Sequence, residues 1–567
     1  MNGLALFGVL AVAKLANVIA VGAPPAGEWL AAIAGDALLA ACFATLALAV
    51  RVRVVRGVVF AALALHAAIA TALVQAIGTP PSSAMLGGLD PAMGDSVGRV
   101  AGPVAFAGAT AVLVAAIAMP AIARRATGRL AHGAAWAGLA LAASWFFLAA
   151  PALPAHRNAL LFFAGSFRAP SPVQAAVARP AGVAVDDERL LALRGAARER
   201  DVVLVVLESV AARFLRPYGA AEDPMPFLSG LAAKSLLVRD AYAVHPESIK
   251  GQIAIFHALH PAPSTRAEDY ARVPVPGLAT LLRGQGYATG LFHSGRFRFL
   301  GMRDVLARSG FEHQADAATI SGVRESSFGV DEEATVDALL AWLDAQGGSR
   351  TFAAWLPIAG HHPYDSPPGG PFAYDTMLGC YRNALWYADR SLRRLCDGLA
   401  ARGRLERTLL VVVGDHGQAF GEHDGNFGHT FALYEENLRV PLIIRVPGVT
   451  DAGITLDAIA SHVDLAPTIL DLCGLPPCDG HEGSSLLAVR DRPALFFADW
   501  GASLVGVRDG RWKAIFDRDT GRELLFDLAA DPQEAIDRSG DRADVVTRLR
   551  ALAVGFFAPR TAAVADW

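Results

Sequence analysis

The sequence has little net charge and few cysteines. Its formal net charge at pH 7 is −4, and outside two short arginine clusters it has no basic stripe, which argues against nucleic acid as a partner. Cys380 and Cys396 fall on one predicted helix about 24 Å apart, at 1.5 Å per residue, which excludes a bridge between them. Cys473 and Cys478 flank a short Gly-Leu-Pro-Pro loop, and the sequence leaves open whether they pair.

Apolar residues are in excess. They make up 53% of the 567 residues, against about 45–50% in ordinary soluble domains. The excess lies in residues 1–153, where apolar stretches recur at a length of roughly 20 residues, enough for a helix to cross a bilayer. We therefore expect a transmembrane domain of five helices, over residues 2–22, 29–50, 57–77, 101–122 and 130–150.

The positions of the arginines predict the orientation of these helices. Arginine and lysine in short loops stay on the cytoplasmic side. Two loops carry such clusters: Arg51, Arg53 and Arg56, and Arg124, Arg125 and Arg129. The amino terminus is then cytoplasmic, and five crossings place everything after Pro151 outside the cytoplasm. The expected location is a bacterial-type inner (plasma) membrane, with a multi-pass chain and a periplasmic or extracellular domain.

Lys14, Asp36 and His66 are ionisable residues that lie within the predicted spans. Such groups usually face other helices, so we interpret them as buried polar contacts within the bundle. Lys14 also interrupts the first apolar run, and no positive region precedes that run. Both features favour a retained helix over a cleavable signal peptide.

The remaining chain divides into three parts. Residues 154–200 are rich in Pro, Ala and Arg and are predicted to form a linker. Residues 201–490 alternate apolar β-type runs with helical stretches, which predicts an α/β domain with a mostly parallel sheet between two helical layers. Residues 491–567 begin with short alternating strands and are expected to form a small antiparallel subdomain of the catalytic domain.

The candidate chemistry lies where two apolar strands end. The run 201–207 is followed by Glu208, and the run 408–413 is followed, after Gly414, by Asp415 and His416. Open α/β sheets place their sites at this carboxyl edge, so the three side chains can converge on one divalent ion. Two oxygen ligands and one nitrogen ligand suit Mn²⁺ or Zn²⁺ better than Ca²⁺ or Mg²⁺, which prefer all-oxygen surroundings.

The strings around these residues resemble the sulfatase family of the alkaline phosphatase superfamily. They occur in the family's order, from about residue 201 to 540: GDHGQAFGE (414–422), GH (428–429), YEENLRVPLII (434–444), DLAPTILD (464–471), LFDL (525–528) and DPQE (531–534). The resemblance implies an alkaline-phosphatase-like α/β fold and a metal-dependent esterase or transferase.

The resemblance places the nucleophile at Ser248, in the string HPESIKGQ (245–252). True sulfatases carry C/S-x-P-x-R at this point, and their Cys or Ser is oxidised to formylglycine. Here Lys250 replaces the Pro and Gln252 replaces the Arg, so we expect Ser248 to remain an ordinary hydroxyl. A hydroxyl needs a metal or a base to become a strong nucleophile, and Ser248 could act as a fourth metal ligand.

This arrangement resembles membrane-anchored lipoteichoic acid synthases and phosphoethanolamine transferases, which use Thr at this point and also carry five spans. By that resemblance Lys250, His293 and Arg303 are candidate substrate-binding residues, although Gly301 stands where an aromatic residue is expected. His361 and His429 are candidate catalytic residues, able to protonate a leaving oxygen or to bind the phosphoryl group. His423 and Asp424 are weaker candidates, the latter for a second ion.

Three functions follow from the sequence. The first is an integral membrane enzyme that transfers a phosphoryl-containing head group, of the phosphoglycerol or phosphoethanolamine class, from a lipid or envelope ester through Ser248 to an envelope acceptor. The second is a sulfatase-like hydrolase, a phosphodiesterase or sulfuric ester hydrolase, with water as acceptor. The third is a non-catalytic envelope protein for binding or sensing. The sequence predicts neither the head group nor the oligomeric state.

Overall fold

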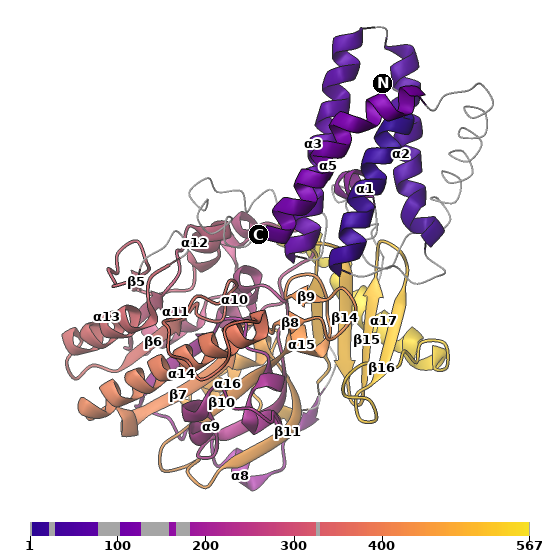
Figure 1. Cartoon of the computed structure of the whole chain (residues 1–567). Coiled ribbons are helices and arrows are strands. Elements are labelled where there is room, and N and C mark those ends of the chain that lie inside the picture. The colour runs from indigo at the N-terminus through magenta and orange to yellow at the C-terminus, as the bar shows by residue number, and fades with distance from the viewer. Residues whose placement is uncertain are drawn as a thin grey trace.

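The computed structural model describes residues 3–21, 29–50, 52–77, 103–125, 158–165, 182–324, 329–490 and 492–565. Figure 1 shows two regions, a group of long helices at one end and a larger α/β region beside it. The long helices are α1 (Gly3–Val21), α2 (Trp29–Ala49), α3 (Arg53–Ile77) and α5 (Pro103–Arg125). They match four of the five predicted spans. The fifth, residues 130–150, lies outside the described residues.

Membrane-spanning potential differs among these helices. Within the described residues, one segment, Arg53–Val74, is long and apolar enough to cross a membrane by length and composition. The apolar parts of the other three are shorter: Leu4–Ile19, Ala32–Ala47 and Ala107–Ile122. The five-helix transmembrane domain and its orientation therefore stay predictions.

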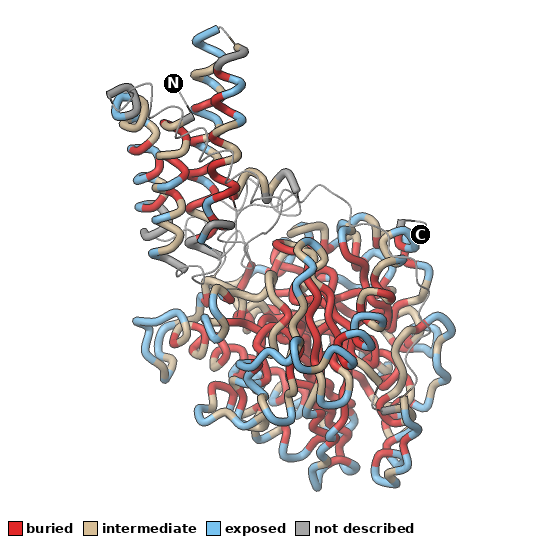
Figure 2. The backbone as a smooth tube through the Cα atoms, turned by 90° about the vertical axis from the view of Figure 1, so that its right-hand side faces the viewer, coloured by how far each residue is buried: buried red, intermediate tan, exposed pale blue. Residues whose placement is uncertain are grey.

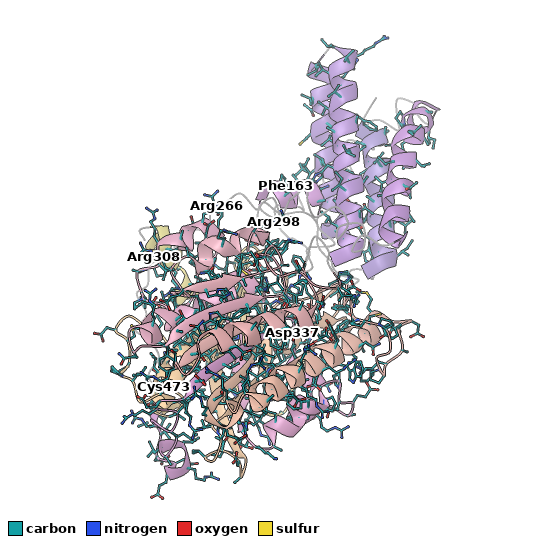
Figure 3. The ribbon with its side chains drawn as sticks, turned by 90° about the vertical axis from the view of Figure 1, so that its left-hand side faces the viewer. Phe163, Arg266, Arg298, Arg308, Asp337 and Cys473 are labelled. Carbon is teal, nitrogen blue, oxygen red and sulfur yellow. The ribbon has the colours of Figure 1, made fainter. Side chains whose placement is uncertain are left out.

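Polar contacts join the helices, as we expected for Lys14 and Asp36. The Lys14 ammonium lies 3.2 Å from the Asp36 carboxylate. Asn158, directly before α7 (Ala159–Gly165), donates to the same carboxylate at 2.6 Å. The ring of Phe163 in α7 lies 6.1 Å from the His66 ring of α3, and Figure 3 shows Phe163 beside the bundle. The short helix α7 is thus attached to the bundle.

The α/β region is built on an eight-stranded mixed sheet in the order β11-β3-β10-β7-β2-β6-β4-β5. Only β10 runs antiparallel to its neighbours β3 and β7, so the prediction of a mostly parallel sheet is confirmed. Its strands are β2 (Asp201–Leu207), β3 (Leu236–Tyr242), β4 (Ala288–His293), β5 (His313–Ala315), β6 (Thr351–Leu356), β7 (Thr408–Gly414), β10 (Arg439–Arg445) and β11 (Ile454–Ser461).

Each face of the sheet is covered by helices, because the strands alternate side chains between two hydrophobic clusters. In β2, Val202 and Leu204 face one cluster and Val203 and Val205 the other. One layer contains α10 (Ser248–His257), α11 (Leu278–Arg283), α12 (Met302–Leu306) and α16 (Leu465–Leu472), and the other α9 (Pro226–Ala232), α13 (Glu332–Ala345) and α14 (Met377–Ala401). Figure 2 shows the sheet as the buried centre of this region.

The linker prediction needs a correction at its end. Residues Val183–Ala184 form strand β1, which pairs with β12 (Val489–Arg490). Leu190, Leu193 and Ala197 are buried in the core of the α/β region. Apolar residues spaced at three and four positions pack here against the sheet domain, so the linker ends before Val183 and not at residue 200.

The predicted C-terminal antiparallel subdomain is present. Its four strands lie in sequence order: β13 (Ala494–Ala498), β14 (Leu504–Asp509), β15 (Trp512–Asp517) and β16 (Glu523–Asp527). Helix α17 (Ala543–Phe557), which we did not predict, covers one face. The structure leaves the thiols of Cys473 and Cys478 unpaired, and Figure 3 places Cys473 at the end of the α/β region far from the bundle.

A buried ion pair connects the subdomain to the main sheet. Lys513 in β15 is fully buried, and its ammonium lies 3.0 Å from Glu435 and 2.9 Å from Glu534. Glu435 begins α15 (Glu435–Leu438), directly ahead of β10. A buried charge is tolerated only when it is paired in this way, so Lys513 fixes the subdomain against the loop that follows the site.

Replacing Lys513 with alanine should therefore reduce the free energy of unfolding by about 3–5 kcal/mol, because the buried carboxylate of Glu534 and the half-buried carboxylate of Glu435 would lose their partner. Lys234→Ala, at an exposed lysine of the same domain, is the control and should change it by less than about 0.5 kcal/mol. Chemical denaturation of both variants measures the difference. Equal stability of the two variants would contradict the role given to Lys513.

Candidate metal and nucleophile site

The site forms where two neighbouring parallel strands end. Strands β2 and β7 pair in register up to Leu207 and Gly414, so the residues that follow emerge side by side. The backbone N–H of Asp415 donates to the carbonyl of Leu207 at 3.0 Å. Glu208 and Asp415 therefore leave the sheet at one point, as the sequence predicted.

Ser248 joins them from the first residue of α10. Its Oγ lies 2.9 Å from Glu208 Oε2, 2.7 Å from Asp415 Oδ2 and 3.3 Å from His416 Nε2. The preceding residue, Glu247, caps the helix by accepting from the N–H groups of Ile249 and Lys250 at 2.8 and 3.2 Å. Glu247 thus sets the turn that points Ser248 at the two strand ends.

The hydrogen bonds of His416 determine which ring nitrogen faces the site. Its Nδ1 lies 2.9 Å from the carbonyl of Gly417, which can only accept, so Nδ1 carries the proton. Nε2 is then the nitrogen that faces Ser248 and the carboxylates, 3.5 Å from both Glu208 Oε1 and Asp415 Oδ2. A neutral imidazole held in this tautomer is a metal ligand.

These donor atoms fit a divalent cation. Glu208, Asp415 and His416 each offer one ligand atom, all within 4.8 Å of one another. Four ligands at about 2.1 Å around a tetrahedral ion lie about 3.4 Å apart, close to the spacing found here. Burial and the charge of Glu208 raise the pKa of Asp415 well above its usual value, because two carboxylates share one enclosed place. A cation would remove that repulsion.

Two candidate catalytic histidines border this group. The His429 ring stacks on His416 at 4.1 Å, and its Nδ1 lies 3.0 Å from the side-chain oxygen of Gln418. Burial, with the neighbouring histidines, lowers the pKa of His429 well below its usual value, so the ring is neutral. The His361 ring lies 5.8 Å from that of His429, and its Nδ1 lies 2.6 Å from the His362 carbonyl.

The candidate substrate-binding residues have different surroundings. His293 ends β4 and is buried, and its Nδ1 lies 3.1 Å from the Leu356 carbonyl. Burial lowers the pKa of His293, and the negative charge of Glu208 acts in the opposite direction. Arg303 is an exposed residue of α12, where its backbone N–H donates to Phe297 O at 2.8 Å. The functional roles of both residues stay predictions.

The Lys250 ammonium pairs with Asp499, 2.6 Å away, which follows β13 in the C-terminal subdomain. Asp499 also accepts from the backbone of Ser264 at 2.7 Å and lies 3.1 Å from His245 Nε2. Burial opposes its charge, but Lys250 and His245 outweigh that effect and hold the pKa of Asp499 below its usual range. Sequence reasoning missed Asp499, although it carries the signal that identified Glu208, an acid directly after an apolar strand.

His423 has a structural position. Its ring stacks on Tyr434 at 3.7 Å, Nδ1 lies 2.7 Å from Glu436 Oε1, and Nε2 lies 3.2 Å from the Glu534 carbonyl. Although it belongs to the loop after Asp415, its hydrogen bonds tie that loop to α15. It is therefore a useful control for the metal site.

Comparison with known proteins identifies this part of the chain. Residues 200–475 match the sulfatase family, and residues 421–551 match the C-terminal part of N-sulphoglucosamine sulphohydrolase. An N-acetylglucosamine-6-O-sulfatase of Bacteroides thetaiotaomicron is 33% identical over 178 residues, 28% of this chain and 32% of that protein. Lipoteichoic acid synthase 2 of Bacillus subtilis is 22% identical over 353 residues, 58% of this chain and 53% of that protein. The matches thus span less than two thirds of these relatives.

The fold agrees with these sequence matches. A crystal structure of a Bacteroides thetaiotaomicron protein assigned to the sulfatases superposes with a TM-score of 0.53 and 16% identity, covering 63% of this chain and 91% of that one. This likeness concerns the fold of the α/β region with its mixed sheet. The chain carries a domain that matches the sulfatase family, over residues 200–475, as the sequence motifs indicated.

Removing a metal ligand should strongly weaken cation binding. We expect Asp415→Ala and Glu208→Ala to weaken Mn²⁺ or Zn²⁺ binding at least 100-fold, because each supplies a charged ligand. Isothermal titration of the metal-stripped protein gives the affinities. His423→Ala should leave them within about threefold, since its ring serves Tyr434 and Glu436. Equal losses in all three variants would argue against a cation at this place.

Proposed function

We propose that the chain is a membrane-anchored, metal-dependent enzyme that takes a phosphoryl-containing head group onto Ser248 and passes it to an envelope acceptor. The observation that carries this proposal is the contact of the Ser248 hydroxyl with Glu208, Asp415 and His416. The formylglycine motif is missing around it, because Lys250 and Gln252 stand at its Pro and Arg positions. Ser248 is thus an alcohol placed among metal ligands.

The reaction would consist of two displacements at one phosphorus. In the first, the Ser248 oxygen forms a bond to phosphorus, and the bond from phosphorus to the donor's alcohol breaks. In the second, the acceptor alcohol forms the new bond and Ser248 regains its hydroxyl. A cation bound to Glu208, Asp415 and His416, by our proposal Mn²⁺ or Zn²⁺, would lower the pKa of the Ser248 hydroxyl and offset phosphate charge.

The surrounding histidines have complementary tasks in this proposal. His429 is neutral and enclosed, which suits it to hold a phosphoryl oxygen or to accept a proton. His361 lies beside it and would give the leaving alcohol its proton. His293 would bind the phosphoryl group from the neighbouring strand end. The ammonium of Lys250 is paired with Asp499, so it would act on the substrate through its charge while that pair is kept.

The helical bundle supports a substrate held in a bilayer. An enzyme and a lipid donor confined to one membrane meet at high effective concentration. The match to lipoteichoic acid synthase 2 extends over 58% of the chain, and we extend the name of that relative to this protein only as a proposal. By that proposal the bundle spans the inner membrane and the sulfatase-family domain lies outside the cytoplasm.

A hydrolase is the second candidate, and the 33% identity to an N-acetylglucosamine-6-O-sulfatase favours it. In that case water replaces the acceptor alcohol in the second displacement. The same residues would then cleave a phosphate or sulfate ester, and Ser248 would still form the covalent intermediate. The third possibility, a binding or sensing protein without catalysis, gives no reason for a hydroxyl placed against three metal ligands.

The covalent intermediate can be detected directly. After the full-length protein is exposed to an envelope lipid extract and quenched, intact-mass analysis should show an added group on Ser248. Ser248→Thr keeps a hydroxyl at the same place and should retain the adduct, whereas Ser248→Ala should show none. An adduct on the alanine variant, or none on the native enzyme, would contradict the assignment of the nucleophile.

A labelled lipid donor separates transfer from hydrolysis. We expect label to appear on an added envelope acceptor, with little free head group while the acceptor is in excess, because an alcohol would compete with water for the intermediate. Chromatography of the products, with the Ser248→Ala variant as background, gives the ratio. Free head group alone, at every acceptor concentration, would select the hydrolase.

A further inference from the structure

Two of the histidines that the proposed function assigns to the substrate, His293 and His361, come at the ends of adjacent strands. His293 is the last residue of β4, and His361 follows β6, which pairs with β4 in parallel up to His293 and Leu356. A loop follows His293, and another loop separates the end of β6 from His361. Their relative position therefore depends on what fixes these two loops to each other.

A single buried carboxylate connects the loops. Glu332, in the first turn of α13, is 1% exposed. One of its oxygens accepts from the backbone N–H groups of Ile358 and Ala359, both at 2.8 Å. Its other oxygen accepts a short hydrogen bond from the hydroxyl of Ser294, the residue after His293.

The connection continues to both histidines through the backbone. The N–H of His361 donates to the carbonyl of Ile358 at 2.9 Å. The N–H of the same residue, Ile358, donates to Glu332. On the other side, the N–H of Ser294 donates to Leu356 O at 3.0 Å, the carbonyl that also lies 3.1 Å from His293 Nδ1. The Glu332 side chain is thus hydrogen-bonded both to the segment that carries His293 and to the segment that carries His361.

Capping of helix α13 does not explain why the Glu332 carboxylate is buried. The N-cap of α13 is the neighbouring Asp331, whose side chain accepts from the N–H of Ala334 at 3.0 Å. An acid in the first turn of a helix normally stays in water, where it costs nothing to ionise. Glu332 is instead buried, and burial raises its pKa to about 7. Its hydrogen bonds to the loops offset this cost.

We propose that Glu332 is a positioning residue that sets the separation of His293 and His361 around the phosphoryl group on Ser248. This inference rests on the proposed function, because it assigns both histidines to the substrate. Glu332 itself would touch neither the substrate nor the cation.

The chain offers a matched control in Asp389. This carboxyl of α14 is also buried, at 3% exposed, and also accepts from two backbone N–H groups, those of Phe227 and Leu228, at 2.8 and 2.9 Å. Burial raises its pKa to about 7 as well. The amides it holds belong to α9, which carries none of the candidate site residues. Asp389→Ala therefore reports the general effect of losing a buried carboxyl.

The test uses the full-length protein in detergent with Mn²⁺. It measures the dissociation constant of inorganic phosphate and the turnover of bis(4-nitrophenyl) phosphate. Glu332→Ala should weaken phosphate binding by about tenfold and lower turnover by roughly 10- to 100-fold, since supporting hydrogen bonds commonly have that effect. Asp389→Ala should change neither by more than about threefold, although its melting temperature falls.

Two further variants separate position from stability. Glu332→Gln should restore both measurements to within about threefold, because its amide oxygen can still accept from the two N–H groups and its NH₂ can donate to Ser294. Ser294→Ala removes one of the three hydrogen bonds and should give a loss smaller than that of Glu332→Ala but clearly above that of Asp389→Ala, about fivefold. This milder variant serves if Glu332→Ala does not fold.

The outcomes test the role of Glu332 separately from the proposed enzymatic function. If Glu332→Ala, or the milder Ser294→Ala, matches Asp389→Ala in phosphate affinity and turnover, the role of Glu332 is overturned and the enzyme assignment stands. If the native protein binds phosphate but does not turn over the diester, the proposed function is overturned, while phosphate affinity still decides the role of Glu332. A native protein that does neither overturns both.

Discussion

The site is defined by two buried carboxylates that the fold holds together against their mutual repulsion. Glu208 and Asp415 are delivered to one point by paired strands, and each lies within hydrogen-bonding distance of the Ser248 hydroxyl. In water such a pair would separate, but here the register of β2 and β7 prevents this. The fold thus creates a strongly negative place that only a proton or a cation can neutralise. The lone pair of His416 makes a metal ion the better match.

Elements outside the main sheet support this arrangement. The C-terminal subdomain supplies Asp499 to Lys250, two residues after the nucleophile, and Lys513 anchors the subdomain to α15. Without the subdomain, Lys250 would lose the carboxylate of Asp499, and Glu435 would lose the ammonium of Lys513. The surroundings of Ser248 are therefore built by both the sheet domain and the C-terminal subdomain.

Local patterns made the sheet and much of the site predictable. An apolar run followed by an acid identifies Glu208 and Asp415, and the runs 201–207 and 408–413 coincide with β2 and β7 to within one residue, because both signals lie in neighbouring residues. Other features depend on distant contacts. The antiparallel direction of β10 leaves no mark on its own residues, and the pairing of Lys250 with Asp499 joins positions 249 residues apart. The packed segment near Leu190 resembles a linker in composition, and only its burial reveals otherwise.

The attachment of α7 to the bundle limits where the catalytic domain can work. Between Gly165, the last residue of α7, and Val183, the first of β1, the chain has room for no more than about 60 Å even when fully stretched. If the bundle spans the bilayer as proposed, the enzyme sweeps a thin layer above the membrane. Acceptors within that layer would be accessible to it, whereas substrates farther from the membrane would have to diffuse inward.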